Sequence, residues 1–237
     1  MIKYVSLDMD GTLINMRFAD KVWMEGVPAL YAEKYDMDFE DAKIVVVGEY
    51  MKVLNQRLSQ AGYGCAKDVV VREYLKVDSD KAEWYDLKHW LDKFGLDETK
   101  EAILQRYERE IEIYPEVKDA LEILSQKYNL VVISNAPRYF LELELEDIGK
   151  YISKIFSVTS DFKKTKNDPQ VYKEVCRRLG AKPHDVIHIG DHYFYDYEVP
   201  LNAGMYALFL DRLGKKTGRG VVGNLREAVE QICSLTA

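Results

Sequence analysis

The chain has 237 residues, and its 33 Lys and Arg against 40 Asp and Glu give a formal net charge of −7. Hydrophobic residues make up 47% of it, a soluble, folded composition that excludes a disordered chain. Apolar runs such as Met205 to Leu210 are far shorter than the roughly 20 residues of a membrane span, so we expect no membrane partner. The first residues do not resemble a signal peptide, so we expect none, and Cys65, Cys176 and Cys233 are too scattered for a disulfide framework or a zinc site. We therefore expect a cytoplasmic protein in a reducing compartment.

The excess of acidic residues lies in the first half of the chain, where residues 16–113 hold 21 acidic and 15 basic residues. No basic stripe is present, so nucleic acid is not an expected partner. The acidic balance also makes a bulky polyanion an unfavourable substrate.

The chain opens with a strand pattern over residues 2–7, which ends in Asp8-Met-Asp-Gly-Thr12. From Phe18 to Glu112 the pattern is helical. One apolar stripe runs over residues 39–54 behind a cap at Asp38. A second runs over residues 84–94 and ends at Gly95. We interpret the aromatic residues of both stripes as core.

After Tyr114-Pro115 strands and helices alternate, which predicts a mainly parallel sheet with right-handed crossovers. The predicted strands are residues 130–133, 155–158, 186–189 and 206–210, and the predicted helices are residues 117–124, 169–179 and 224–233. The sequence therefore predicts an α/β fold, a doubly wound Rossmann-like parallel sheet. Residues 1–16 and 114–237 form this core, and residues 17–113 form a helical insertion.

Asp8 and Asp10 are two residues apart, so on a strand their side chains share one face. Neighbouring carboxylates repel, and burial penalises both charges, so the pair requires a metal ion or a nucleophile beside a protonated acid. Gly11 permits a tight turn whose amides suit an anion, and Thr12 adds a hydroxyl. The alternative is an acidic turn without chemistry, because Asp and Gly are common in turns.

Three further strand ends or loops carry polar residues. Ser134-Asn135 can donate to a phosphate, Lys166 supplies a cation, and Gly190-Asp191 is followed by Asp196. Each alone reads equally well as an ordinary polar or charged loop. The carboxyl ends of parallel strands meet at one edge of a sheet, so together they predict one site.

These motifs resemble those of the haloacid dehalogenase superfamily of aspartate-nucleophile phosphotransferases. Asp8-Met-Asp-Gly-Thr12 matches the first motif, Ser134-Asn135 the second, Lys166 the third, and Gly190-Asp191 with Asp196 the fourth. The insertion is similar to the helical cap of capped members, so the resemblance covers the whole chain. Lys166 is preferred to Lys163 and Lys164 for its spacing to Asp168-Pro169, although the family often has proline where Asn167 stands.

The resemblance implies a role for each matched residue. Asp8 would be the nucleophile that becomes an aspartyl-phosphate, Asp10 the general acid and base, and Lys166 a catalytic cation. Phosphate would be bound by Gly11, Thr12, Ser134, Asn135 and Lys166. Mg²⁺ would be held by Asp8, Asp191 and the Asp10 backbone carbonyl, with Asp196 as a further ligand or as support behind them.

Two residues outside the motifs are candidate substrate contacts. Arg17 follows the first motif, where it either clamps an anionic group or only solvates a hinge. His192 follows Asp191 and reads equally well as a rim residue without a role. We interpret His188, on a predicted strand, as core.

The resemblance implies a Mg²⁺-dependent phosphatase that acts on a small phosphorylated metabolite, as a monomer or a homodimer. Family members that cleave carbon–halogen bonds lack an acid where Asp10 stands, so dehalogenation is not expected. A phosphomutase of the same architecture is the alternative, and a non-catalytic binding module is a more distant one.

Overall fold

The computed structural model describes residues 1–60 and 81–235, so Cys65 lies outside the described residues. Its contacts divide the chain into two units, Met1–Met16 with Ile111–Ala237 and Arg17–Glu110. After the helical insertion the chain re-enters the first unit at residue 111, whereas the sequence predicted residue 114. The reason is that Ile113 bridges to Ile14, and the Asn15 amide donates to the Glu112 carbonyl at 3.0 Å.

In the described residues of the first unit, the strands form one parallel six-stranded sheet in the order β3-β2-β1-β4-β5-β6. The strands are β1 (Tyr4–Leu7), β2 (Asn129–Ser134), β3 (Ile152–Ser157), β4 (Val186–Gly190), β5 (Tyr206–Leu210) and β6 (Val221–Val222). The first strand therefore lies between β2 and β4, and Leu7 pairs with Val132 and Ile189. The predicted doubly wound α/β fold is confirmed.

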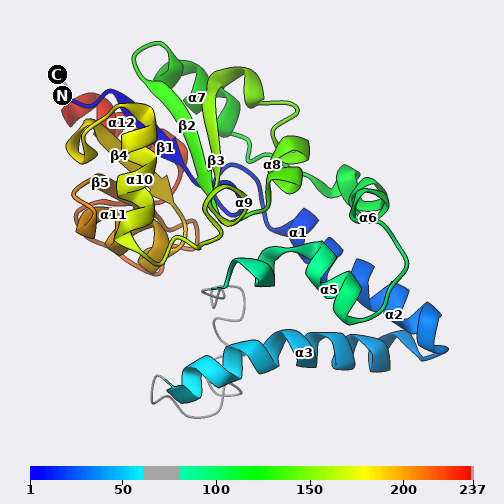
Figure 1. Cartoon of the computed structure of the whole chain (residues 1–237). Coiled ribbons are helices and arrows are strands. Elements are labelled where there is room, and N and C mark those ends of the chain that lie inside the picture. The colour runs from blue at the N-terminus through cyan, green and yellow to red at the C-terminus, as the bar shows by residue number, and fades with distance from the viewer. Residues whose placement is uncertain (61–80, 236–237) are drawn as a thin grey trace. The chain divides into compact units, whose positions relative to one another are not determined.

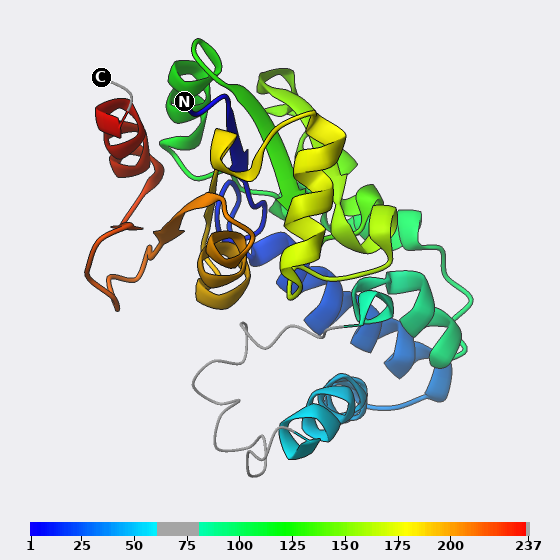
Figure 2. The same cartoon turned by 60° about the vertical axis from the view of Figure 1, so that its left-hand side comes forward.

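Helices cover both faces of this sheet (Figures 1 and 2). The helices are α7 (Val117–Ser125), α8 (Arg138–Glu144), α9 (Val158–Phe162), α10 (Pro169–Leu179), α11 (Val199–Asn202) and α12 (Leu225–Leu235). The pictures show α10 and α11 on one face, and α7 with α12 on the other. Short 3₁₀ turns at Gly149–Tyr151 and Pro183–Asp185 and a π-helix at Tyr193–Glu198 complete the unit.

Helix α10 illustrates why these segments fold as predicted. The Asp168 side chain accepts the Gln170 amide, Pro169 occupies the first turn, and Gly180 ends the helix at a φ of +65°. Its inner face, which includes Tyr172 and Val175, packs into the core that Val131 and Ile133 of β2 line. The strand predicted at residues 155–158 begins three residues earlier, at Ile152, and it ends one residue earlier because Ser157 caps α9 by accepting the Ser160 amide.

The second unit is helical in its described residues. Its elements are α1 (Arg17–Lys21), a π-helix (Val22–Gly26), α2 (Val27–Tyr35), α3 (Phe39–Gln60), a 3₁₀ turn (Ala82–Tyr85), α5 (Leu87–Lys93), α6 (Lys100–Tyr107) and a 3₁₀ turn (Glu108–Glu110). Asp38 accepts the Glu40 amide at the start of α3. The rings of Tyr50, Trp90 and Phe94 pack together, in agreement with the expected aromatic core.

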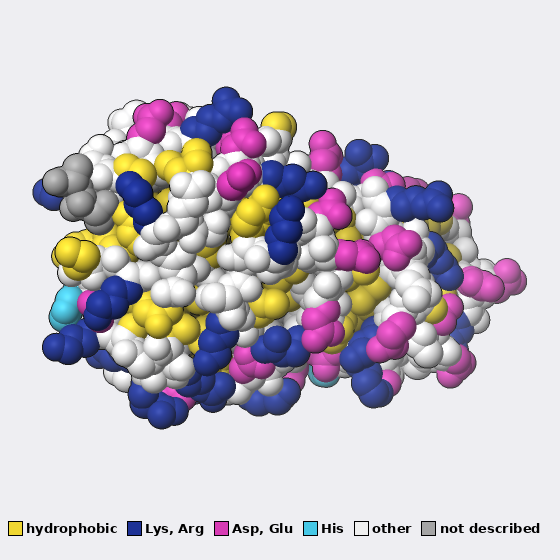
Figure 3. All heavy atoms as spheres, turned by 90° about the horizontal axis from the view of Figure 1, so that it is seen from above, with side chains coloured by type: hydrophobic (Ala, Val, Ile, Leu, Met, Phe, Trp, Pro, Cys, Tyr) yellow, Lys and Arg dark blue, Asp and Glu magenta, His cyan; other side chains and the backbone are white. Residues whose placement is uncertain are grey.

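The surface is mixed in character. Figure 3 shows basic and acidic side chains interspersed over the face it presents.

Cys176 and Cys233 are free thiols, and Cys176 is buried. Within residues 1–60 and 81–235, no helix has the length and hydropathy that crossing a membrane requires.

Candidate active site

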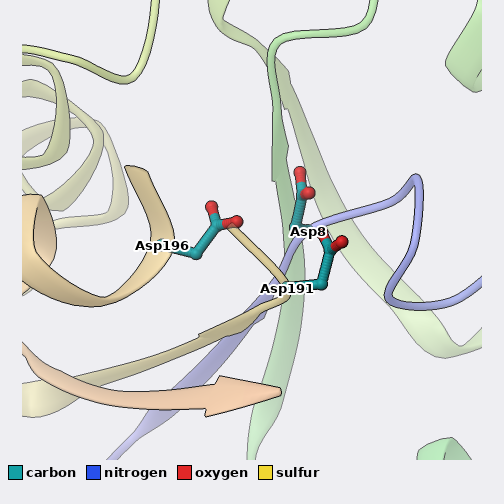
Figure 4. Close-up of side chains that lie close together, drawn as sticks. All are labelled: Asp8, Asp191 and Asp196. Atoms are coloured by element: carbon teal, nitrogen blue, oxygen red, sulfur yellow. The ribbon is translucent and has the colours of Figure 1, made fainter. Parts of the chain in front are cut away.

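Three aspartates meet at the carboxyl edge of the sheet (Figure 4). Asp8 directly follows β1, Asp191 directly follows the neighbouring strand β4, and Asp196 lies in the π-helix Tyr193–Glu198. One carboxylate oxygen from each lies within 4.8 Å of the other two. The parallel pairing of β1 and β4 therefore assembles a carboxylate cluster from residues nearly the whole chain apart.

Two glycines make room for this cluster. Gly11 has a φ of +75°, and a Cβ atom there would lie 2.4 Å from Asp191 Oδ2. A Cβ atom at Gly190 would lie 2.4 Å from Asp196 Cγ. Any side chain at either position would displace a carboxylate, so both must be glycine for the cluster to form.

Lys166 is the cation of the cluster. Its side chain is buried, and Nζ donates to Asp8 Oδ1 at 2.6 Å and to Asp196 Oδ1 at 2.7 Å. Lys163 and Lys164 are exposed, and Lys164 pairs with Asp168 at 3.5 Å. The structure thus brings Lys166, as predicted from its spacing, to the nucleophile candidate.

Burial and charge set the protonation of these groups. Burial raises the pKa of Asp8 to about 7, although Lys166 lowers it. Burial lowers the pKa of Lys166, but Asp196 and Asp8 outweigh it and hold that pKa well above its usual value. Burial also opposes ionisation of Asp196, yet Lys166 and His188 keep its pKa below the usual range. Lys166 and Asp196 therefore form a stable ion pair beside an Asp8 that ionises near neutral pH.

The donor set fits a hard divalent cation. Carboxylate oxygens are the ligands that Mg²⁺ prefers, and three of them gather here. When all three are ionised, Lys166 compensates one charge and a net charge of −2 remains. Asp196 accepts hydrogen bonds from Lys166, His188 and the His192 amide. Its carboxylate is therefore better placed to hold Lys166 than to bind the cation directly.

The predicted phosphate donors of the second motif lie at the end of β2. Ser134 is buried, and its Oγ accepts the Ala136 amide at 3.0 Å. Asn135 Oδ1 accepts the backbone amide of Lys166 at 2.9 Å. This contact connects the second motif to the third and fixes the position of the Lys166 backbone.

The binding of phosphate by the loop of Gly11 and the Thr12 hydroxyl stays a prediction, but in this structure the backbone amides of both residues have partners within the loop. Gly11 N–H donates to the Ile14 carbonyl at 2.8 Å, and Thr12 N–H donates to the Met9 carbonyl at 3.2 Å. The Thr12 side chain is completely buried. Both amides close the loop itself, because a turn this tight satisfies its own donors.

Asp10 lies on the same loop, and its side chain is partly exposed. Strand β1 ends at Leu7, so Asp8 and Asp10 do not share a strand face as expected. Among the described residues, the carboxylate cluster leaves out the Asp10 side chain. A role for its backbone carbonyl as a metal ligand stays a prediction.

The two candidate substrate contacts have structural partners. Arg17 Nε lies 2.6 Å from Glu110 Oε2, which joins the first and last residues of the helical unit. His192 Nδ1 accepts the Tyr195 amide at 3.1 Å, and its ring stacks on Tyr195. The His192 side chain thus caps the π-helix Tyr193–Glu198, and a role of Arg17 or His192 in binding substrate stays a prediction.

Sequence reasoning missed Arg212 and Glu144, and it placed His188 correctly in the core without foreseeing its bond to Asp196. His188 of β4 is buried and bonded to Asp196, Arg212 binds the carbonyls of Gly11 and Thr12, and Glu144 is buried on α8. The signal for His188 was its polarity on a strand that is buried on both faces. Arg212 and Glu144 gave no such signal, because charged residues are common in loops and helices.

Comparison with known proteins identifies the family. The family model of haloacid dehalogenase-like hydrolases matches residues 2–204. The chain belongs to this family. As a haloacid dehalogenase-like hydrolase, it carries the four motifs at the sheet edge described above.

Its relatives and structural neighbours differ in their described activities. The chain is 36% identical over 88 residues to haloacid dehalogenase-like hydrolase domain-containing protein 3 of Danio rerio. It is 29% identical over 116 residues to (S)-2-haloacid dehalogenase 4A of Burkholderia cepacia. These matches cover 36% and 47% of the chain, and the chain spans about a third and about half of the length of these two relatives.

A solved structure described as a HAD phosphatase from Thermococcus onnurineus superposes with a TM-score of 0.77 at 22% identity, covering 98% of both chains. A 2-haloacid dehalogenase from Pseudomonas syringae superposes with a TM-score of 0.63 at 21% identity, covering 99% of this chain and 100% of that one. Both likenesses bear on the fold and leave the substrate class open.

Proposed function

We propose that this hydrolase is a Mg²⁺-dependent phosphatase that cleaves a small phosphomonoester through a phosphorylated Asp8. The observation that carries the proposal is the cluster of Asp8, Asp191 and Asp196, in which buried Lys166 pairs with Asp8 and Asp196. A phosphomonoester brings a dianion to this cluster, where uncompensated charges about 4 Å apart cost about 4 kcal/mol per pair at an effective dielectric constant of about 20. A divalent cation beside the nucleophile removes that repulsion.

The same charge argument separates this reaction from dehalogenation. A 2-haloacid carries a single negative charge on its carboxylate, away from the carbon that is attacked. Its displacement requires no divalent cation beside the nucleophile, so a three-carboxylate cluster would have no purpose. Asp10 adds to this argument, because it supplies a proton to an alkoxide leaving group, whereas a halide leaves unprotonated.

The side chains divide the proposed reaction between them. Asp8 attacks phosphorus, and Asp10 protonates the departing ester oxygen and then takes a proton from the water that hydrolyses the aspartyl-phosphate. Lys166 neutralises Asp8 and the incoming phosphoryl oxygens, while Ser134 and Asn135 offer donors at the end of β2. Mg²⁺, held by Asp8, Asp191 and the Asp10 carbonyl, would supply charge compensation for the phosphoryl group. A helical unit inserted at this place is suited to exclude water and to read the leaving group.

The test is an assay of phosphate and halide release in parallel. Sugar phosphates, nucleotides, phosphoglycolate and 2-haloacids are supplied to the enzyme with Mg²⁺ or with a chelator. We expect Mg²⁺-dependent phosphate release, abolished in Asp8→Asn and reduced at least about 100-fold in Asp10→Asn. Asp119→Asn, at an exposed acid of the same unit, is the matched control and should keep full activity.

Other results would replace the proposal. Halide release that persists with a chelator would make the protein a dehalogenase, as the name of the Burkholderia cepacia relative states for that protein. An isomeric sugar phosphate without free phosphate would make it a phosphomutase. Turnover that persists in Asp8→Asn would remove the covalent mechanism.

A further inference from the structure

A chain of buried polar side chains runs from β1 to the nucleophile candidate. Ser6 Oγ lies 2.8 Å from His188 Nδ1, and His188 Nε2 lies 3.1 Å from Asp196 Oδ1. Asp196 Oδ1 accepts from Lys166 Nζ, which also donates to Asp8. Ser6, His188 and Asp196 are completely buried. His188 therefore contacts Asp196, which binds Lys166, and Lys166 in turn binds Asp8.

The partners of His188 determine which ring nitrogen carries the proton. Asp196 also accepts from Lys166 and from the His192 amide, so its carboxylate is an acceptor and Nε2 must donate to it. Nδ1 then accepts from the Ser6 hydroxyl, whose other acceptor, the Ile187 carbonyl, lies at a longer 3.4 Å. Tyr172 donates to the Tyr195 carbonyl at 2.7 Å and therefore presents only its lone pairs to Nε2, at 3.3 Å. These contacts agree on a neutral ring protonated at Nε2.

The surroundings of His188 also disfavour a charged ring, because the side chain is completely buried. The neighbours of His188 on β4, Ile187 and Ile189, are apolar and equally buried. An apolar residue would also fill this position without the cost of burying a polar ring. The hydrogen bond to Asp196 therefore explains why a histidine occupies this buried position.

We propose that His188 is a positioning residue of the phosphatase reaction, holding Asp196 so that Asp196 in turn holds Lys166 against Asp8. The proposal rests on the proposed function. Three donors fix the Asp196 carboxylate: Lys166 and His188 at Oδ1 and the His192 amide at Oδ2. Without the His188 donor the carboxylate can rotate and take Lys166 with it. A displacement of about 1 Å at a reacting group costs about 100-fold in rate.

The rate test compares variants that keep or remove the donor. His188→Leu removes it and should lower kcat about 10- to 100-fold, with KM changed less than about threefold. His188→Gln restores an N–H donor near Asp196 and should recover most of the lost rate. Ser6→Ala is the matched control, since it removes an equally buried partner of the same ring but leaves the donor to Asp196, and its kcat should stay within about threefold of wild type.

A second measurement reads the contact without any substrate. Of the four histidines in the chain, the one whose ¹⁵N side-chain signals disappear in His188→Leu is His188. We expect these signals to show a ring protonated at Nε2, and Asp196→Asn to shift them. A ring protonated at Nδ1, or a His188→Leu enzyme with wild-type kcat, would overturn the proposal. Absence of phosphate release from the wild type would instead overturn the proposed function, while the NMR result still decides the contact.

Discussion

Glu144 is a buried carboxylic acid of helix α8. It lies on the inner side of α8 beside Phe140 and Leu141, and it is 1% exposed. Neither carboxylate oxygen has a hydrogen-bond partner among the residues that the structure describes. Burial raises its pKa well above the usual value, and the charges of Asp10 and Asp8 raise it further. Burial of this carboxyl therefore costs stability, because neither of its oxygens regains a hydrogen bond in the described part of the fold.

Replacing this carboxyl should stabilise the protein. Glu144→Leu keeps the volume and removes two unpartnered polar atoms, so we expect the free energy of unfolding to rise by about 1–3 kcal/mol near neutral pH. Urea denaturation followed by circular dichroism measures the change. Glu142→Leu, at an exposed position of the same helix, is the control and should change stability by less than about 0.5 kcal/mol. A destabilised Glu144→Leu protein would mean that this carboxyl has a bound partner in solution.

The glycine of the first motif gives a second prediction at this scale. Gly11→Ala places a Cβ atom 2.4 Å from Asp191 Oδ2, at a φ of +75°. Gly180→Ala imposes a similar φ of +65° at the end of α10, but there no atom lies within 4 Å of the new Cβ. Both variants should lose about 1 kcal/mol of stability from backbone strain, but only Gly11→Ala should lose activity, by at least about 100-fold. Phosphate release and thermal unfolding measured on both variants check this, and an active Gly11→Ala enzyme would contradict the assigned role of Asp191.

At the scale of elements, Arg212 connects three segments of the first unit. It follows β5 and donates to the carbonyls of Gly11 at 3.1 Å and Thr12 at 2.7 Å. It also pairs with Glu116 at 2.7 Å, and its guanidinium lies 3.5 Å from the centre of the Tyr114 ring. The loop after β1, the segment before α7 and the end of β5 are therefore held by one side chain.

Loss of this connection should affect both stability and the site. Arg212→Met leaves the Glu116 carboxylate and two carbonyls without their donor, so we expect a loss of about 3–5 kcal/mol in the free energy of unfolding. The loop that carries Asp8 and Asp10 loosens as well, so KM for substrate and Mg²⁺ should rise. Arg226→Met, whose pair with Asp119 is exposed and 4.0 Å long, is the control and should change neither quantity measurably. Equal behaviour of the two variants in denaturation and kinetics would show that Arg212 is only a surface residue.

The elements also show what the sequence could predict. Strands β2, β4 and β5 and helices α7, α10 and α12 lie within two residues of their predicted bounds, because hydrophobic periodicity and caps such as Asp168 are local signals. The start of β3, three residues before its predicted bound, was missed because residues 152–154 are partly or fully exposed and show no buried apolar run. The motifs predicted that Asp8, Lys166, Asp191 and Asp196 meet, since each follows or lies near a strand end. That His188 and Arg212 support them depends on side-chain contacts over long sequence distances, which no local pattern contains.

For the whole molecule, the carboxylate cluster links stability to pH and to divalent cations. The pKa of Asp8 is 3.8 in an ordinary environment and about 7 in the fold. Between these values the folded protein holds a proton that the unfolded chain has released, so the contribution of Asp8 to stability falls as pH rises from about 4 to about 7. Mg²⁺ binds the ionised carboxylates of the folded state, so it should offset this loss at high pH and have little effect at low pH.

The prediction is tested by the midpoint of urea unfolding near pH 5 and near pH 8, with Mg²⁺ or with a chelator. In the chelator the wild type should lose more stability between the two pH values than Asp8→Asn, because asparagine does not titrate. Millimolar Mg²⁺ should raise the midpoint near pH 8 in the wild type and not in Asp191→Asn, which lacks one of the three carboxylates. Each comparison is a difference between two variants of the same chain. The contributions of the other titrating groups to the pH dependence of stability therefore cancel to first order. Equal pH dependence of wild type and Asp8→Asn would show that Asp8 is ionised throughout, and a Mg²⁺ effect that survives in Asp191→Asn would place the cation elsewhere.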